Sequence, residues 1–439
     1  MAVNLRTGGA SGVCMNILTM SCWSHSIKYH LFSWGGESLL AAGLVKRVGL
    51  GGTSVSLKAP GREEETQDVG FIDHQGAVAL ILDTLNDPRH GVGDEAGRIG
   101  AVGHRVAHGG ERFHHSVVID DQVLDAIREL KQLAPLHNAA NIAGIEAAAG
   151  LMSHIPHVAI FDTAFHVTMP DFAYVYPLPY EWYKRFGVRR YGFHGPSHIY
   201  LSRRAATLLG KPAADCNLIT IHIDKGVSLC AIRNGVSIDT SMGLTPLEGA
   251  VMETRSGDFD AGITSFIMQQ LNISSREMES ILNQKSGILG ITGWHAERRQ
   301  ILEAASTGHA RCRLALEMEA YRLKKYIGAY LAAVGSLDAV VFTAGAGEWE
   351  WFARELTLGG LECFGILPDR ERNRAAGSER KEALITSDSS PVRVFVIPTD
   401  EELVFAQDVT AILSGEYSGH LHQNYSFARP DFVPRQPAV

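Results

Sequence analysis

Short polar segments that carry arginine, histidine or aspartate recur along this sequence beside glycine or apolar residues. They are residues 103–111 (GHRVAHGGE), 133–138 (LAPLHN), 161–166 (FDTAFH), 191–198 (YGFHGPSH) and 254–258 (TRSGD). Arginines can neutralise phosphoryl oxygens, histidines can donate hydrogen bonds to them, and a carboxylate can act through a metal or position another group. Such a set suits the transfer of a phosphoryl group to a carboxylate and requires no covalent nucleophile.

Each segment also has a simpler interpretation when it is taken alone. Residues 103–111 are compatible with a surface turn whose charges are solvated. His166 and His222 follow apolar runs, where a histidine is usually a hydrogen-bonded structural residue, and Arg255 and Asp258 are close enough in sequence for a salt bridge within a turn. The repetition of the pattern favours a shared anion site over unrelated turns.

The composition restricts how an anion could be bound. The chain has 439 residues, 45% apolar and 20% charged, which is ordinary for a globular protein and long enough for two or three domains. Its 40 basic and 48 acidic residues give a formal net charge of −8, which argues against a general electrostatic surface for nucleic acid. Any bound anion must therefore be held by a local cluster.

The sequence gives no sign of a membrane partner or of a disulfide framework. No apolar stretch reaches the roughly 20 residues of a membrane helix, and residues 1–14 lack the apolar core of a signal peptide. The six cysteines are scattered without a C-x-x-C pair, which favours a reducing cytoplasm. The 45 glycines predict many turns where the backbone approaches another group closely, whereas the roles of the 19 histidines depend on their positions.

Two similar groups of strands are predicted far apart in the sequence. The first group has strands at 16–20, 27–32 and 38–48 with a polar turn at 21–26, and the second has strands at 218–223, 227–233 and 236–240 with a turn at 224–226. The Asn-Gly pair at 234–235 is typical of a tight hairpin. This repetition predicts two domains built on one plan, with the turn after each first strand facing a shared cleft.

Other apolar runs end abruptly in polar residues. The run 157–161 ends at Asp162, 339–342 ends at residues 343–348, and 392–397 ends at residues 398–402. Ligands of open α/β sheets bind beyond the carboxyl ends of strands, so these ends are candidate sites. Apolar residues at spacings of three and four predict helices at 121–133, 139–151, 196–209 and 311–334.

Longer segments around these positions resemble one protein family. In chain order they are GHRVAHGGE, LAPLHNAANIAGIEAA, IFDTAFHVTMP, RRYGFHGPSH, DTSMGLTPLEG, TRSGD, KSGILGITG, FTAGAGE and IPTDEE. From about Gly103 to Asp408 the chain resembles the acetate kinase family of acyl kinases, in the same superfamily as sugar kinases, actin and the heat-shock ATPases. A weaker resemblance extends back to Met15.

The resemblance implies a role for individual residues. Arg105 and Arg255 match two arginines that hold the transferring phosphoryl group, and Asp162 matches a catalytic carboxylate. His194 matches a histidine that contacts the transition state, and His137 matches a second active-site histidine. Besides Arg105, the substrate-binding residues implied for the acyl tail are Ala107, Leu136, Phe193 and Pro246.

The resemblance also implies cofactors. ATP or ADP would be the co-substrate, and Mg²⁺ (or Mn²⁺), which prefers oxygen ligands, would bind at Glu401 and Ser21. The residues expected to bind the nucleotide are Lys28, His222, Lys225, Gly226, Glu297, Arg299, Gly345, Ala346 and Gly347.

The implied fold class is α/β, the two-domain actin-like ATPase fold with a central interdomain cleft. We expect a first domain at 15–163 plus 398–414, closed by a helix at 401–412, and a second domain at 164–397 that carries the nucleotide side and the dimer interface. Residues 1–14 would be an N-terminal extension and 415–439 a flexible tail. The expected partners are a short-chain carboxylate, a nucleotide and a second copy of the chain in a homodimer.

The sequence departs from the family pattern on the side that would bind the phosphoryl donor. The replacements are Ser21 for asparagine, Trp23 for glycine, Asp224-Lys225 for Gly-Asn, Glu253 for glycine, Glu297 for aspartate, Trp349 for asparagine and Asp400 for asparagine. Trp23 adds bulk to a tight turn, and Glu253 brings negative charge near a phosphate site, which opposes anion binding unless it is paired.

Three interpretations of these departures stay open. The protein is an ATP-dependent acyl kinase with a remodelled donor pocket, or it uses another donor such as pyrophosphate, or it is a catalytically degraded kinase that serves as a binding or regulatory protein. We favour the first because every recognised catalytic side chain is present. A sugar kinase is disfavoured, since the segments around Arg105, His137 and Asp162 have no reason to persist in a sugar site. Acetate is the expected acceptor, and the small Ala107, where the family often has valine, leaves room for propionate.

Overall fold

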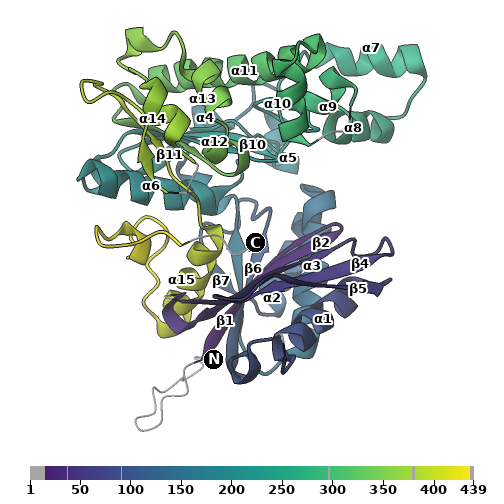
Figure 1. Ribbon diagram of the computed structural model, residues 1–439. Helices are drawn as coiled ribbons and strands as arrows, with labels where there is room; N and C mark the ends of the chain where they lie inside the picture. Colours follow the sequence, from purple (N-terminus) through teal and green to yellow (C-terminus); the bar gives the residue numbers. More distant parts are fainter. Residues whose placement is uncertain (1–14, 37, 90, 295–296, 378–380, 436–439) are drawn as a thin grey trace.

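The computed structural model describes residues 15–36, 38–89, 91–294, 297–377 and 381–435. The chain forms two mixed β-sheets, one in the lower half and one in the upper half of Figure 1, and helices pack around each. This is an α/β architecture, as predicted. After the second sheet the chain returns to the first sheet and forms the helix Glu401–Ser414 beside it. The chain therefore passes between the two halves more than once.

The first sheet has eight strands in the order β5-β4-β3-β2-β1-β6-β8-β7. They are β1 (Asn16–Trp23), β2 (Ser26–Ser33), β3 (Leu39–Lys46), β4 (Thr53–Lys58), β5 (Glu65–Gly70), β6 (Ile99–Val106), β7 (Val117–Val118) and β8 (His157–Phe161). β1 and β6 are parallel, and so are β6 and β8, so their carboxyl ends meet at one edge. Arg105, near the end of β6, and Asp162, directly after β8, therefore lie side by side.

The second sheet has six strands in the order β11-β10-β9-β12-β14-β13. They are β9 (Leu218–Ile223), β10 (Val227–Arg233), β11 (Val236–Thr240), β12 (Ala339–Thr343), β13 (Ala383–Leu384) and β14 (Arg393–Val396). The strands predicted between residues 218 and 240 are confirmed with their predicted bounds. Asn234 and Gly235 have φ values of 51° and 75°, the left-handed backbone that a tight two-residue hairpin turn requires.

Helices cover both faces of the first sheet. Those beside it are α1 (His74–Asn86), α2 (Asp121–Glu129), α3 (Pro135–Leu151) and α15 (Glu401–Ser414). Successive side chains of a strand point to opposite faces. Accordingly, Leu18 packs in one core cluster with Val78 of α1, and Ile17 packs in another with Phe405 of α15. The strand that leads into the first turn is therefore buried on both sides and rigidly placed.

The second sheet is also covered on both faces, by α6 (Gly195–Leu209) and α11 (Ala310–Val334). Leu201 of α6 shares a core cluster with Val341, and Leu323 of α11 shares one with Val340 on the opposite face of β12. The remaining helices are α4 (Asp171–Tyr174), α5 (Tyr180–Phe186), α7 (Gly262–Leu271), α8 (Ser275–Gln284), α9 (Gly287–Thr292), α10 (Arg298–Ser306), α12 (Gly345–Trp349), α13 (Trp351–Leu358) and α14 (Arg370–Ala375).

The polar turn predicted at 21–26 is wrong in its extent. β1 continues to Trp23 and β2 begins at Ser26, so only Ser24 and His25 form the turn. Cys22 is buried and packs so closely on α3 that a Cβ added at Gly144 would lie 2.2 Å from its Sγ. This packing holds the strand in an extended conformation despite its polar sequence.

The flexible tail predicted at 415–439 is wrong for residues 415–435. The rings of Tyr425 and Phe427 are buried and stack with centroids 4.7 Å apart, and Phe427 lies against Tyr200 of α6. Aromatic burial fixes this segment although it has no periodic pattern. Residues 1–14 and 436–439 lie outside the described residues, and the proposed domain boundaries stay predictions. None of the helices in the described ranges is long and apolar enough to cross a membrane.

Candidate active site

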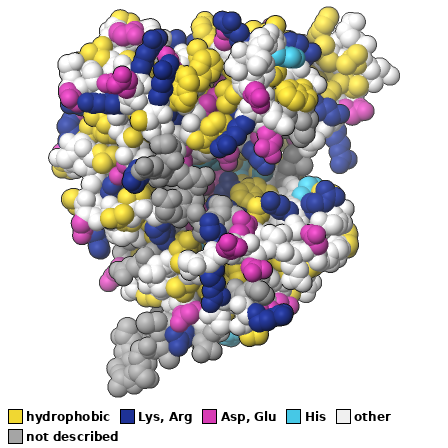
Figure 2. Space-filling model, viewed as in Figure 1, with side chains coloured by type: hydrophobic (Ala, Val, Ile, Leu, Met, Phe, Trp, Pro, Cys, Tyr) yellow, Lys and Arg dark blue, Asp and Glu magenta, His cyan; other side chains and the backbone are white. Residues whose placement is uncertain are grey.

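A cavity of about 470 Å³ lies where the edges of the two sheets face each other. Figure 2 shows the molecule hollowed between its upper and lower halves. Thirteen of the predicted site residues line this cavity, which we call the first cavity: Lys28, Arg105, Ala107, His137, Asp162, Phe193, His194, His222, Lys225, Gly226, Pro246, Arg255 and Glu401. The fold thus brings together residues from segments far apart in the sequence.

Arg105 and Asp162 form a two-point ion pair at the floor of the first cavity. Arg105 donates from Nε to Asp162 Oδ1 at 2.9 Å and from Nη2 to Oδ2. Burial raises the pKa of Asp162, whereas the charge and hydrogen bonds of Arg105 oppose that rise. Because Asp162 engages Nε and Nη2, the guanidinium is fixed in one plane and Nη1 remains for a ligand.

Arg255 and His137 complete the polar wall of the first cavity. Arg255 Nη1 lies 3.4 Å from the carbonyl oxygen of Pro246, which holds the guanidinium only loosely. Burial, together with the charges of Arg255 and Arg105, lowers the pKa of His137 to about 4. His137 is therefore neutral at physiological pH and able to donate one hydrogen bond without adding charge.

His194 is held firmly at the start of α6. It has a φ of 60°, an uncommon backbone conformation for a residue other than glycine, and the following amide of Gly195 donates to Asp162 O at 2.9 Å. Its ring stacks on His222 with centroids 4.1 Å apart, and its Nδ1 lies 2.9 Å from Ser228 Oγ. Burial, with the neighbouring His222, lowers the pKa of His194 well below its ordinary value.

The acidic residues at the start of α15 differ in their partners. Glu402 forms an ion pair with Lys28 at 2.7 Å, and although burial opposes it, Lys28 lowers the pKa of Glu402 to about 2. Glu401 lines the cavity instead, and burial followed by the charge of Glu402 raises its pKa to about 8. A carboxylate so poorly compensated by cations is suited to bind one, and its oxygens are ligands that Mg²⁺ prefers.

Ser21, the other predicted metal ligand, does not line the first cavity. It is 3% exposed and pairs with Lys28 across the β1–β2 ladder. Within the described ranges, no group of three or more histidine, cysteine, aspartate or glutamate side chains is arranged to hold a metal ion. Of the two predicted metal ligands, Glu401 is therefore the one that lines the first cavity, and a metal held there would draw further ligands from water or substrate.

The apolar side of the first cavity contains Ala107, Phe193 and Pro246. Leu136, predicted beside them, lies in α3, but its side chain is outside the described residues. Two buried asparagines of α3 that the sequence analysis missed fix this wall. Asn141 accepts from the Ala107 amide at 2.9 Å and donates to Cys22 O at 2.8 Å, and Asn138 is bonded to both backbone groups of His108. Their i, i+3 spacing next to His137 was the available signal.

A second cavity of about 540 Å³ adjoins the first and shares Asp224 and Lys225 with it. Four predicted nucleotide-binding residues line it, namely Lys225, Glu297, Gly345 and Ala346, together with the departures Asp224, Glu253 and Trp349. Apolar side chains of Ile288, Ile301 and Leu316 complete its wall. We call this the second cavity.

Arg299 and Gly347, also predicted to bind the nucleotide, line neither cavity. Arg299 lies over the ring of Trp349 with its Cζ 5.1 Å from the centroid, and Gly347 accepts a hydrogen bond from Arg354 at 2.9 Å. The neighbouring Arg298 lines the second cavity instead and is paired with Glu319 and Glu350. Sequence reasoning missed Arg298 because its two partners are far away in the chain.

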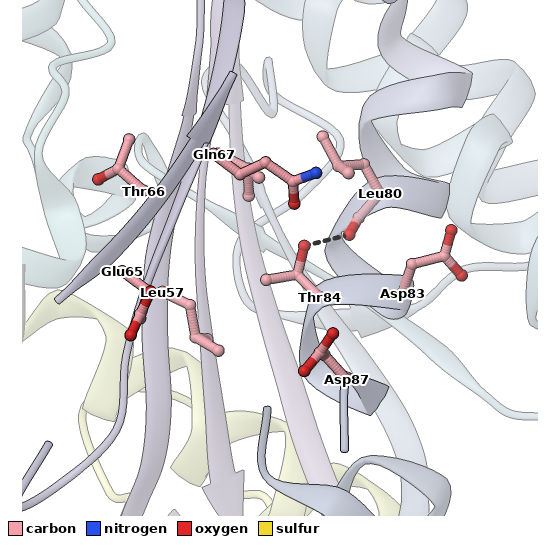
Figure 3. Close-up of a pocket in the computed structure, with 9 residues that line it drawn as sticks. Leu57, Glu65, Thr66, Gln67, Leu80, Asp83, Thr84 and Asp87 are labelled. Carbon is pink, nitrogen blue, oxygen red and sulfur yellow. Dashed lines mark hydrogen bonds between the residues drawn. The ribbon is translucent and has the colours of Figure 1, made fainter. Parts of the chain in front are cut away.

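Another pocket, between β4, β5 and α1, is remote from this arrangement. Figure 3 shows its acidic wall and the Thr84 hydroxyl donating to Leu80 O at 2.7 Å. It is about 300 Å³ in volume and has no arginine, lysine or histidine among its lining residues. It is therefore unsuited to an anion, and the functional site is assigned to the first and second cavities.

Comparisons with known proteins agree with this geometry. Residues 16–407 match the Acetokinase family model. The acetate kinase of Geobacter sulfurreducens is 59% identical over 419 residues, which cover 95% of this chain and all of that protein. The structure is similar to the acetate kinase of Porphyromonas gingivalis, with a TM-score of 0.86, 42% identity and coverage of 91% and 100% of the two chains. It is also similar to a propionate kinase from Francisella tularensis, with a TM-score of 0.84, 36% identity and coverage of 90% and 98%. The chain therefore belongs to the acetokinase family and has the two-domain fold of these kinases.

Proposed function

We propose that this protein transfers a phosphoryl group reversibly between ATP and acetate, giving acetyl phosphate and ADP by direct in-line transfer. Membership of the family makes it a phosphotransferase with a carboxyl group as acceptor. The observation that carries the proposal is the convergence of Arg105, Arg255, His137 and His194 on one cavity. Two cations and two neutral hydrogen-bond donors suit the negative charge on the oxygens of a transferring phosphoryl group.

Each residue has a defined task in this mechanism. Arg105, held in plane by Asp162, and Arg255 offset the charge that develops on the phosphoryl oxygens while the acetate oxygen attacks. His194 and His137, both neutral, donate hydrogen bonds to those oxygens or to the carboxylate. Ala107, Phe193 and Pro246 enclose the methyl group and exclude water from the reacting atoms.

We propose Mg²⁺ as the metal, with Mn²⁺ as a substitute, and Glu401 as the side chain that would hold it. When bound, the ion would neutralise phosphate charge. Binding of the cation would keep Glu401 ionised, which its buried position disfavours in the metal-free protein.

We propose that the second cavity takes the nucleoside part of ATP. Its apolar wall and the half-buried Trp349 suit a planar base, and the shared Lys225 stands where the phosphates would pass into the first cavity. A donor without a base, such as pyrophosphate, would leave this cavity unused. The complete set of catalytic side chains likewise argues against a degraded kinase.

Acetate is the proposed acceptor, and propionate is proposed as a competing one. Ala107 contributes only a methyl group to the acyl wall, so a longer tail has room beside it. A methylene group in an apolar pocket changes the activation free energy by only about 1–3 kcal/mol, so discrimination between the two acids should be modest.

We also propose a homodimer formed through the second half of the chain and located in the cytoplasm. Large apolar side chains are exposed there on α4, α5 and α7: Phe172 is 84%, Trp182 45% and Phe266 60% exposed. Such exposure is typical of a protein interface. The five described cysteines are free thiols, which accords with a reducing compartment. Light scattering on wild type and Phe266→Asp tests the dimer.

A trapping assay tests the proposed reaction. The protein is incubated with acetate and Mg²⁺, with either ATP or pyrophosphate as donor, and hydroxylamine converts any acyl phosphate to a hydroxamate. We expect hydroxamate with ATP and little with pyrophosphate. The reverse result would assign another donor, and no product with either donor would refute the enzymatic function.

A further inference from the structure

A chain of hydrogen bonds runs from the buried centre of the second sheet to His194. Thr220 Oγ1 of β9 lies 2.7 Å from His198 Nδ1, His198 Nε2 lies 3.0 Å from Ser228 Oγ, and Ser228 Oγ lies 2.9 Å from His194 Nδ1. Thr220, His198 and Ser228 are 0% exposed. The chain thus reaches the catalytic histidine from behind, on the side away from the first cavity.

The Ser228 hydroxyl can accept two hydrogen bonds, but among the described residues its Oγ contacts only His194 and His198. Its own proton must therefore go to one of these two rings, which leaves two directions of donation along the chain. A hydroxyl donates one proton, and a neutral imidazole donates from one nitrogen and accepts at the other. Burial and neighbouring histidines lower the pKa of both His194 and His198 well below the ordinary value, so both rings are neutral. All the bonds therefore run from Thr220 toward His194, or all run from His194 toward Thr220.

Because Thr220 is buried, donation must run from Thr220 toward His194. If His198 donated to Thr220, the Thr220 hydroxyl proton would need another acceptor, and among the described residues it has no second hydrogen-bond partner. Buried hydroxyl protons are rarely left without an acceptor, because the lost hydration is not replaced. When Thr220 donates to His198, His198 donates to Ser228 and Ser228 donates to His194, every proton in the chain is satisfied.

We propose that Thr220, His198 and Ser228 are positioning residues that hold the proton of His194 on Nε2. A Cβ added at Gly226 would lie 3.4 Å from His194 Nε2 and 3.2 Å from Arg255 Nη1, so Nε2 lies on the cavity side near the phosphoryl-binding arginine. The inference rests on the proposed function, in which His194 donates to a phosphoryl oxygen. The other tautomer would direct a lone pair at that oxygen and repel it.

The tautomer is measured directly by NMR of the full-length protein labelled with ¹⁵N-histidine, without substrate. The His194 signals are assigned from their absence in His194→Gln, and one-bond coupling identifies the protonated nitrogen. We expect the proton on Nε2 in the wild type. Thr220→Val keeps the shape of the side chain but removes the donor to His198, so we expect a mixture of His194 tautomers.

Thr240→Val is the matched control. Thr240 is equally buried, in β11 of the same sheet, and its hydroxyl donates at 3.0 Å to Leu229 O, which also accepts from the Ser241 amide. Its replacement should leave the His194 tautomer unchanged. Should Thr220→Val fail to fold, Ser228→Ala removes the last donor of the chain and is expected to give the same mixture.

Kinetics separate positioning from a general loss of structure. A wrong histidine tautomer removes an interaction of the transition state, so we expect Thr220→Val and Ser228→Ala to lower kcat by about 10–100-fold with KM for acetate and ATP within about twofold. Thr240→Val should retain wild-type kcat. Equal changes in kcat and KM in all three variants would overturn the inference.

Two spectral results would also overturn it: a wild-type His194 protonated on Nδ1, or an Nε2 proton that persists fully in Thr220→Val and Ser228→Ala. Because the spectra require no turnover, they remain decisive if the wild type forms no acyl phosphate. In that case the trapping assay refutes the proposed function, while the NMR spectra still decide independently which nitrogen of His194 carries the proton.

Discussion

The first and second cavities share Asp224 and Lys225 but are stabilised differently. In the first cavity, Arg105 is bonded to Asp162, and His194 is bonded to Ser228 and stacked on His222. In the second, Arg298 is paired with Glu319 and Glu350, but Asp224, Lys225 and Glu297 are exposed. Polar groups therefore hold one another in place around the first cavity, whereas solvent surrounds the three exposed side chains of the second.

This difference accounts for the departures at Asp224, Lys225 and Glu297, which are exposed, but not for the buried Ser21 or for Trp23, which lines the first cavity. A substitution at Asp162 would leave the buried Arg105 guanidinium without its partner, which is costly for folding. Replacing Gly-Asn by Asp224-Lys225 on an exposed turn leaves no buried group without its hydrogen-bond or ion-pair partner. Departures are therefore tolerated at these exposed positions, and their effects should appear in donor binding more than in the chemical step.

The largest expected effect on activity comes from a substitution in the first cavity, where the phosphoryl group would be transferred. Arg255→Ala should lower kcat by about 10²–10³-fold with little change in KM for acetate, because the guanidinium acts on charge that develops in the transition state. Steady-state kinetics with both substrates measures this. Arg276→Ala, an exposed arginine of α8, is the control. Small and equal changes in kcat and KM would contradict a transition-state role.

A smaller effect is expected when the wall of the second cavity is changed. Trp349→Ala should raise KM for ATP by about 10-fold, since stacking on a base is worth about 1–3 kcal/mol. The KM for acetate should not change. Trp351→Ala, whose side chain lines neither cavity, serves as the control. An unchanged KM for ATP would show that the base binds elsewhere.

A still smaller change in activity is expected from a substitution in the apolar wall of the first cavity, which would contact the acyl tail. Ala107→Val should lower kcat/KM for propionate by roughly 5–10-fold relative to acetate, because the added methyl groups occupy the space of the longer tail. Competition assays with acetate, propionate and butyrate measure the ratio. A wild type that already rejects propionate sharply would show that other residues limit the tail.

The smallest effect on catalysis is expected at Asp408, which lies outside both cavities. Burial raises the pKa of Asp408 to about 7, although hydrogen bonds from Ser116 and Tyr425 oppose the rise. In the unfolded chain an aspartate titrates near pH 4, so the folded state binds the extra proton between about pH 4 and pH 7. Stability should therefore fall as pH rises through this range.

Asp408→Asn removes that titration and tests the sign. Between pH 5 and pH 8 the free energy of unfolding of the wild type should decrease by roughly 1–3 kcal/mol relative to the variant. Urea unfolding at the two pH values measures the difference, and kcat should be nearly unchanged. Parallel pH profiles for the two proteins would contradict the raised pKa.

Several parts of the fold were predictable because their signals are local. The strands β9, β10 and β11 have the predicted bounds, since apolar runs and an Asn-Gly turn are both short-range features. Arg105 and Asp162 were expected in one site only from the family resemblance, and the parallel pairing of β6 and β8 is what brings them together. The extent of β1 and the packing of residues 415–435 were not predictable in this way, because both depend on contacts with helices that are distant in the chain.

The candidate site was predictable in its residue types and less so in its detail. Thirteen predicted residues line the first cavity, but Ser21, Arg299 and Gly347 line neither cavity. Whether a side chain faces a cavity depends on strand register and helix rotation, which no single motif records. Asn141 was missed because its two partners, Ala107 and Cys22, lie in other elements.

The sequence by itself determined the chemistry: paired arginines, histidines and an aspartate at strand and helix ends, suited to moving a phosphoryl group onto a carboxylate. Tertiary structure decided which of these groups meet, which carboxylate is left to a cation, and on which nitrogen His194 carries its proton. Residue types and periodicity act over a few neighbours, whereas burial and hydrogen-bond direction arise only when distant segments pack together.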